Sequence, residues 1–136
     1  MLKLGAWVEK NNFIGTYKLE NFEIEENSGQ RRPWGKDVHG LLIYTADGYM
    51  SVSINKSIET KSDNDSKNIF DSILFYSGTY QVEGGTITHH VTQASNPQRI
   101  GKTMLRFASI DGDKVTLSSP KESFGIAHLT WKRIVK

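Results

Sequence analysis

Polar and apolar residues alternate along most of the chain, which predicts β-strands joined by tight turns. In the first such segment, Tyr17 and Leu19 share one face, and Phe22 and Ile24 continue the apolar row after a shift of one residue. A shift of this kind is typical of a β-bulge. We therefore predict one long opening strand that bends near Asn21.

Three hairpins follow, each marked by glycine or aspartate at its turn. The hairpins and their turns are 41–54 about Ala46-Asp47-Gly48, 78–95 about Gly84-Gly85, and 103–120 about Asp111-Gly112-Asp113-Lys114. A closing strand, 124–135, has two faces, and we expect its inner face to be the one with Ala127, Leu129 and Trp131.

Two adjacent histidines in the second hairpin must point to opposite faces of the sheet, because successive strand residues do so. If Gly84 and Gly85 form the turn, Tyr80 pairs with His89. The face that holds this pair also holds three aliphatic residues, Val82, Ile87 and Val91. We therefore predict that His89 lies inside and His90 outside.

The third hairpin places a charged residue on an apolar face. If Ile110 pairs with Val115, Arg106 points inward with the apolar residues of this hairpin. A buried guanidinium needs an anionic partner, either an internal carboxylate or a ligand. In the alternative register, displaced by one residue, Leu105 and Phe107 lie inside and Arg106 lies on the surface.

One segment has the three- and four-residue spacing of a helix instead. It runs from Asp65, a good N-cap, to about Tyr76 and ends before Gly78. We predict that this single substantial helix packs across one end of the fold through its apolar stripe, Ile69, Phe70, Ile73 and Leu74. The stretch 31–40 carries a proline and two glycines and is predicted to be a loop.

The order of these elements predicts an all-β fold. The chain has an opening strand, a meander of hairpins and a closing strand, which makes about 8–10 strands without crossover helices. This order indicates an up-and-down antiparallel β-barrel with one short helix. The hydrophobic content of 37 % is low, which suits a closed sheet with one apolar face to each strand. The length of 136 residues fits one domain, so we expect residues 1–136 to form a single barrel domain.

The charge and the cysteine content argue against several classes of function. Seventeen basic and fifteen acidic side chains give a net charge of +2, and the basic residues are scattered, which disfavours a dedicated nucleic-acid-binding protein. Without cysteine, neither a disulfide nor a thiolate metal site can form, and the four histidines lack metal-site spacing. No apolar run is long enough for a signal peptide or a membrane span. We expect a cytoplasmic protein with no metal, cofactor, nucleic-acid or membrane partner, and the sequence carries no signal for its oligomeric state.

Six segments of the chain carry a family resemblance. In order, they are IGTYKLENFE, GLLIYTADGYMSV, FDSILFYSGTYQVEGGTITHHV, GKTMLRF, DGDKVTLSSP and LTWKR. From Phe13 to Arg133 the chain resembles the lipocalin-like domain family of small bacterial and fungal proteins. In lipocalins at large, a Gly-x-Trp near the start packs against a basic residue after the last strand. Here Gly15 and Tyr17 stand at that place, with Arg133 as the matching base. The resemblance implies a lipocalin or calycin type of barrel with an interior of ligand size, in a family whose function is mostly unassigned.

The candidate ligand-binding residues are those expected to face the barrel interior or cover its mouth: His89, Arg106, Tyr80, Tyr44, Trp34 and Trp131. His89 is either a core histidine bonded to Tyr80 or to a backbone carbonyl, or a cavity group that binds or protonates a ligand. The aromatic residues are either core or the walls of a ligand site. Trp34 either covers the mouth as a lid or folds onto the rim.

Three functions follow from these alternatives. The first is binding of a small, mostly hydrophobic or amphiphilic molecule in the lumen, with Arg106 and His89 at its polar end. The second is an enzyme, such as a cyclase, isomerase or hydratase, that uses a lumenal histidine or tyrosine as acid or base. The third is a structural barrel filled by its own side chains. A cavity of about 300 Å³ or more favours the first two.

Overall fold

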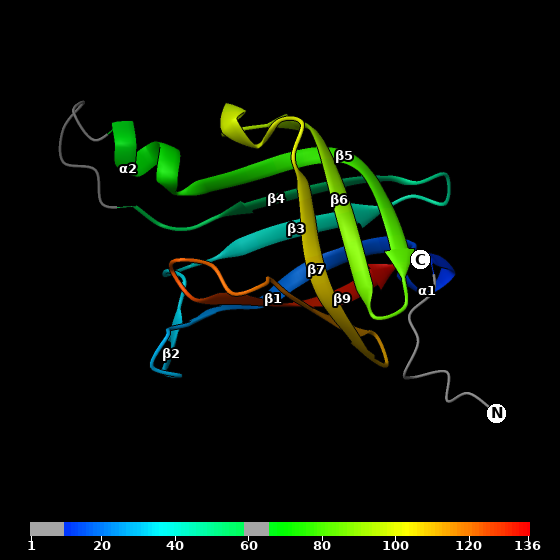
Figure 1. Cartoon of the computed structure of the whole chain (residues 1–136), viewed down its shortest axis with the longest axis horizontal. Helices are drawn as coiled ribbons and strands as arrows, with labels where there is room; N and C mark the ends of the chain where they lie inside the picture. The colour runs from blue at the N-terminus through cyan, green and yellow to red at the C-terminus, as the bar shows by residue number, and fades with distance from the viewer. Residues whose placement is uncertain (1–9, 59–65) are drawn as a thin grey trace.

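Nine β-strands dominate the computed structural model of this chain, which describes residues 10–58 and 66–136 (Figure 1). The strands are β1 (Gly15–Glu25), β2 (Arg31–Pro33), β3 (His39–Tyr44), β4 (Tyr49–Asn55), β5 (Ile73–Glu83), β6 (Thr86–Ala94), β7 (Thr103–Asp111), β8 (Lys114–Ser118) and β9 (Ile126–Val135). Within these ranges three short helices accompany them: α1 (Lys10–Phe13), α2 (Ser66–Asp71) and the 3₁₀ helix η2 (Pro97–Arg99). No helix within the described ranges is long and apolar enough to cross a membrane.

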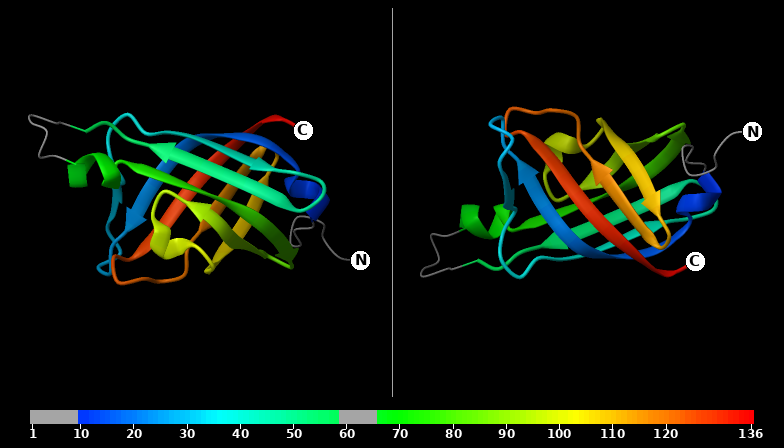
Figure 2. Two further views of the ribbon diagram at one scale, coloured as in Figure 1. Left: turned by 90° about the horizontal axis from the view of Figure 1, so that it is seen from above. Right: turned by 90° about the horizontal axis from the view of Figure 1, so that it is seen from below.

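The strands form a closed antiparallel barrel. Neighbours follow the order β2-β1-β3-β4-β5-β6-β7-β8-β9, and β9 pairs back with β1, so all strands except β2 make an eight-stranded ring (Figure 2). Two register shifts let β1 follow β9 along nearly its whole length, and the second lies between Leu19 and Asn21, where the bend was predicted. The predicted up-and-down barrel is therefore confirmed.

Alternate residues of each strand fill the interior. In β4, Met50, Val52 and Ile54 are buried, as their common face predicts. The inner face of β9 is also the expected one, because Trp131 is buried and Ala127 and Leu129 pack against the core.

One end of the barrel is closed by α1 and aromatic side chains. The Tyr17 hydroxyl donates to the Phe13 carbonyl oxygen at 2.7 Å. Arg133 donates from Nη2 to the Tyr17 hydroxyl at 2.7 Å and to the Asn12 carbonyl, and its guanidinium lies 5.2 Å from the Tyr17 ring centroid. Tyr17 and Arg133 thus pack together as the resemblance implies, and this packing ties the first and last strands to α1.

The predicted helix is shorter than expected. Helix α2 ends at Asp71, and Ile73 and Leu74 belong to β5; the expected N-cap, Asp65, lies outside the described residues. Packing across one end through the apolar stripe was wrong, because Ile69, Phe70 and Ile73 are 44 %, 46 % and 48 % exposed. Helices α1 and η2 were not anticipated, and the predicted loop 31–40 contains β2 and the start of β3.

Gly78 explains the error in the helix boundary. It does not follow a helix but lies within β5, at a register shift relative to β6. A Cβ atom at Gly78 would overlap the carbonyl oxygen of His90. The glycine is therefore required by the close approach of two strands, which from sequence is indistinguishable from a helix C-cap.

Candidate functional site

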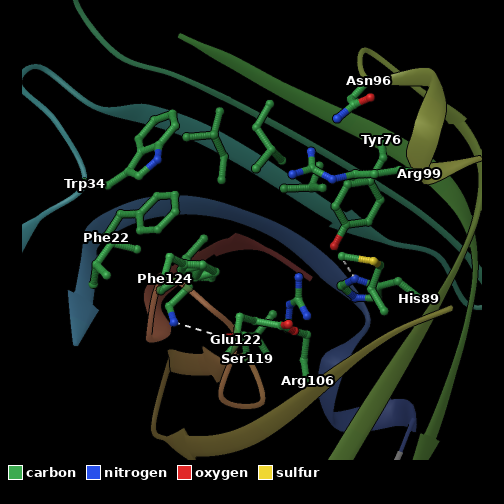
Figure 3. A pocket seen from close by; sticks show the side chains of 18 of the residues that line it. Phe22, Trp34, Tyr76, His89, Asn96, Arg99, Arg106, Ser119, Glu122 and Phe124 are labelled. Atoms are coloured by element: carbon green, nitrogen blue, oxygen red, sulfur yellow. Dashed lines mark hydrogen bonds between the residues drawn. The ribbon is translucent and has the colours of Figure 1, made fainter. Parts of the chain in front are cut away.

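The barrel holds a cavity of about 680 Å³. Its lining extends from residues near β2 and η2, such as Trp34 and Arg99, to His89 in the interior (Figure 3). Trp131 also lines it. This volume exceeds the roughly 300 Å³ at which small-molecule pockets begin. The filled structural barrel is therefore not what the described residues form.

His89 forms the floor of this cavity and is held by two tyrosines. The Tyr44 hydroxyl lies 2.6 Å from Nε2. The Tyr76 hydroxyl lies 2.7 Å from Nδ1 (Figure 3). Tyr76 and His89 come from the neighbouring strands β5 and β6, whereas Tyr44 comes from β3, so the contact between Tyr44 and His89 crosses the interior of the barrel. His89 is 2 % exposed and His90 is exposed, as predicted.

Burial keeps this tyrosine–histidine–tyrosine chain uncharged. It lowers the pKa of His89 to about 3, and the positive charge of Arg106 acts in the same direction. Burial also raises the pKa of Tyr44 and of Tyr76. With both ring nitrogens engaged and so low a pKa, His89 is poorly suited to act as a general base towards a molecule in the cavity.

Tyr80 is paired with His89 across β5 and β6, as predicted, but it does not bond to the imidazole. Its hydroxyl donates to the Thr45 carbonyl at 2.7 Å, and its ring packs against Tyr44 at a centroid distance of 4.6 Å. Neither Tyr80 nor Tyr44 lines the cavity. Tyr44 contacts one of the lining residues, His89, through its hydroxyl group.

Arg106 lines the cavity in the register predicted from the third hairpin. Ile110 pairs with Val115, and Phe107 on the opposite face is 49 % exposed, which rules out the alternative register. The half-buried guanidinium donates from Nη1 to the Leu105 carbonyl at 2.8 Å. Among the described residues, no carboxylate lies within ion-pair distance of it.

Three more cations line the cavity. Arg32 pairs with Glu26 at 3.1 Å, whereas Arg99 and Lys102 form no ion pair within the described part of the chain. Glu122 is the one carboxylate in the lining that the structure describes. The cavity therefore carries an excess of positive charge that an anionic group can neutralise.

Trp34 is fixed at the rim. Its ring stacks on Phe22 with centroids 4.7 Å apart and an interplanar angle of 7°. Lys56 Nζ lies 4.1 Å from the Trp34 ring centroid and donates to the Trp34 carbonyl at 3.4 Å. Trp34 and Phe124 both line the cavity (Figure 3), so Trp34 borders the mouth from a fixed position.

Trp131 lines the inner part of the cavity and is 1 % exposed. Its indole N–H has no acceptor among the described residues. Four of the six predicted residues thus line the cavity, namely His89, Arg106, Trp34 and Trp131. Two further lining residues, Tyr76 and Arg99, are not among the six candidates. Tyr76 was assigned to the end of a helix, and Arg99 lies in a segment without strand periodicity.

Known proteins were compared with this chain. A family model described as a lipocalin-like domain matches residues 14–134. No curated protein matches the chain. Among solved structures, fatty-acid-binding protein 1 of Echinococcus granulosus is similar over 90 % of this chain and 97 % of its own, with 14 % sequence identity and a TM-score of 0.44.

Proposed function

Because the chain belongs to the lipocalin-like domain family, we propose that its barrel binds a small, mostly apolar molecule with an anionic end. The observation that carries this proposal is the Arg106 guanidinium in the cavity, with no carboxylate partner among the described residues. A partly buried cation without a counter-ion is unfavourable, and a ligand carboxylate or similar group satisfies it.

The rest of the lining suits the body of such a molecule. Aliphatic and aromatic side chains from several strands face the cavity, among them Leu42, Val52, Leu117, Leu129 and Trp131. Transfer of an apolar chain from water to such a wall contributes about 25 cal/mol for each Å² buried. The apolar wall therefore supports affinity, and Arg106 supports the choice of an anionic end.

The enzymatic alternative has less support. An acid–base catalyst needs a group that can gain or lose a proton near the working pH. Burial moves the pKa of His89 down to about 3 and raises that of Tyr76, so both groups are moved away from neutrality. Binding without chemistry is the function that these groups fit better.

We expect Arg106→Met to weaken the binding of decanoate about 10- to 100-fold, because hydrogen bonds to charged groups contribute about 1.5–3 kcal/mol. Thermal shift measures this directly. At a ligand concentration 100 times Kd, decanoate stabilises the parent protein by about 2.7 kcal/mol, and at the same concentration the variant gains much less.

Lys132→Met is the matched control, because Lys132 is an exposed cation on β9. The control should respond to decanoate as the parent does. Equal responses of the parent and Arg106→Met would remove Arg106 from the site. A parent protein that no anionic or apolar amphiphile stabilises would refute the binding proposal.

A further inference from the structure

We infer that Tyr44 and His89 position Tyr76 as a hydrogen-bond donor to the anionic group of the ligand, beside Arg106. This rests on the proposed function and adds a specificity device to it. The polar end of the ligand meets two hydrogen-bond donors, the charged Arg106 guanidinium and the neutral Tyr76 hydroxyl. The Tyr76 O–H is free to donate because the proton on His89 Nδ1 donates to the Tyr76 oxygen.

The burial of Tyr44 determines the direction of its hydrogen bond with His89. It is 1 % exposed, and its hydroxyl has one hydrogen-bond partner within the described residues, His89 Nε2 at 2.6 Å. A buried hydroxyl hydrogen without an acceptor is avoided in folded proteins. Tyr44 therefore donates to Nε2, and Nε2 is the unprotonated nitrogen of the ring.

The proton of His89 follows from that hydrogen bond. A neutral imidazole carries one N–H and one acceptor nitrogen, so the hydrogen lies on Nδ1. The Tyr76 hydroxyl oxygen lies 2.7 Å from Nδ1 and accepts this hydrogen. The opposite arrangement, with Tyr76 donating to Nδ1 and Nε2–H donating to Tyr44, leaves the Tyr44 O–H without an acceptor.

Tyr76 is then left with its own O–H hydrogen. Of the two tyrosines, Tyr76 is the one that lines the cavity, so its hydrogen can reach a ligand there. Burial is the main influence on the pKa of Tyr76 and raises it, whereas the positive charges of Arg106 and Arg99 act to lower it, so these cations lie close to the Tyr76 hydroxyl. A group that accepts hydrogen bonds and carries negative charge, such as a carboxylate, satisfies both; a primary alcohol satisfies the charge requirement poorly.

The tautomer of His89 can be measured without any ligand. We expect long-range ¹H–¹⁵N correlation spectra of the ¹⁵N-histidine-labelled protein at pH 7 to show a neutral His89 ring with the proton on Nδ1. His89→Gln identifies the signals. A ring protonated on Nε2 would overturn the inference.

Selectivity is the second readout. We expect Tyr76→Phe to lower the ratio of decanoate to decan-1-ol affinity about tenfold, because a hydrogen bond to a charged acceptor is roughly twice as strong as one to a neutral acceptor. Calorimetric titration gives both affinities. Tyr49→Phe, which removes a hydroxyl from a side chain 58 % exposed, is the matched control and should leave the ratio unchanged.

The outcomes separate this inference from the function on which it rests. A parent protein that binds neither probe refutes the proposed function, and the inference falls with it. Binding of decanoate together with an unchanged affinity ratio in Tyr76→Phe refutes the inference alone. A merely structural role of Tyr76 would weaken both probes equally and leave the ratio unaltered.

Discussion

Acidification from pH 7 to pH 3 is expected to lower the free energy of unfolding by about 4 kcal/mol through His89 alone. In the folded protein, burial and the charge of Arg106 depress the pKa of His89 from 6.5 to about 3. The unfolded chain therefore binds a proton on this ring below about pH 6.5, whereas the folded chain stays unprotonated down to about pH 3. Within that window the unfolded state holds more protons, so stability falls as the pH falls.

The pH range from 7 to 5 separates the contribution of His89 to stability from the contributions of the carboxyl groups. Hydrogen bonds from His128 to Glu25 and from Thr45 to Asp47 lower the pKa of these two carboxyl groups below their usual values of 4.5 and 3.8. Their contributions are present at higher pH and are lost only as the pH falls through that acidic range. Between pH 7 and pH 5, His89 is therefore expected to account for a loss of about 2 kcal/mol.

Urea denaturation at pH 7 and at pH 5 measures this loss. His89→Gln, which cannot take up the proton, should be less stable at pH 7 but should lack the 2 kcal/mol dependence. His90→Gln is the matched control, since it changes the neighbouring, exposed histidine. A pH dependence that survives in His89→Gln would show that the buried ring is not its source.

Gly78→Ala is expected to destabilise the protein by about 3 kcal/mol, the upper end of the usual range for overpacking. The added Cβ would overlap the His90 carbonyl oxygen, which is backbone and cannot turn aside as a flexible side chain can. Relief requires β5 and β6 to separate at the place where Tyr76 and His89 meet. Denaturant titration gives the free energy, and the thermal response to decanoate reports on the site.

Gly85→Ala serves as the matched control. Gly85 lies in the turn of the same hairpin, and a Cβ there would meet no atom within 4 Å. We expect its stability to lie within about 0.5 kcal/mol of the parent, as for other surface changes. Similar losses in both variants would show that the effect at Gly78 reflects glycine flexibility and not the close approach of two strands.

The barrel and the orientation of His89 were predictable because both depend on local patterns. A two-residue alternation and a glycine turn fix which residues of a hairpin share a face, and Tyr80 and His89 paired accordingly. The inward position of Arg106 followed in the same way from the pairing of Ile110 with Val115.

The partners of His89 were not predictable from such patterns. Tyr44 comes from β3 and reaches His89 on β6 across the interior, a contact that no periodicity encodes. The place of Tyr76 beside His89 was not predicted, for a different reason. The apolar residues before it recur at helical spacing, and Gly78 resembles a cap, so the segment matched a helix although its last part is the start of β5. Tertiary pairing overrode the local preference there.

The two ends of the barrel differ, because α1 and aromatic side chains close one end and the mouth beside Trp34 lies away from it. Phe13 and Tyr17 pack on Tyr44 beneath His89, so the floor of the cavity has aromatic rings behind it. If the barrel binds an anionic amphiphile as proposed, we expect its charged end to reach Tyr76 and Arg106 and its tail to point towards the mouth beside Trp34 and Phe124. Affinity is then expected to rise with tail length only until the tail reaches the rim, because methylene groups beyond the rim stay in water and bury no further apolar surface.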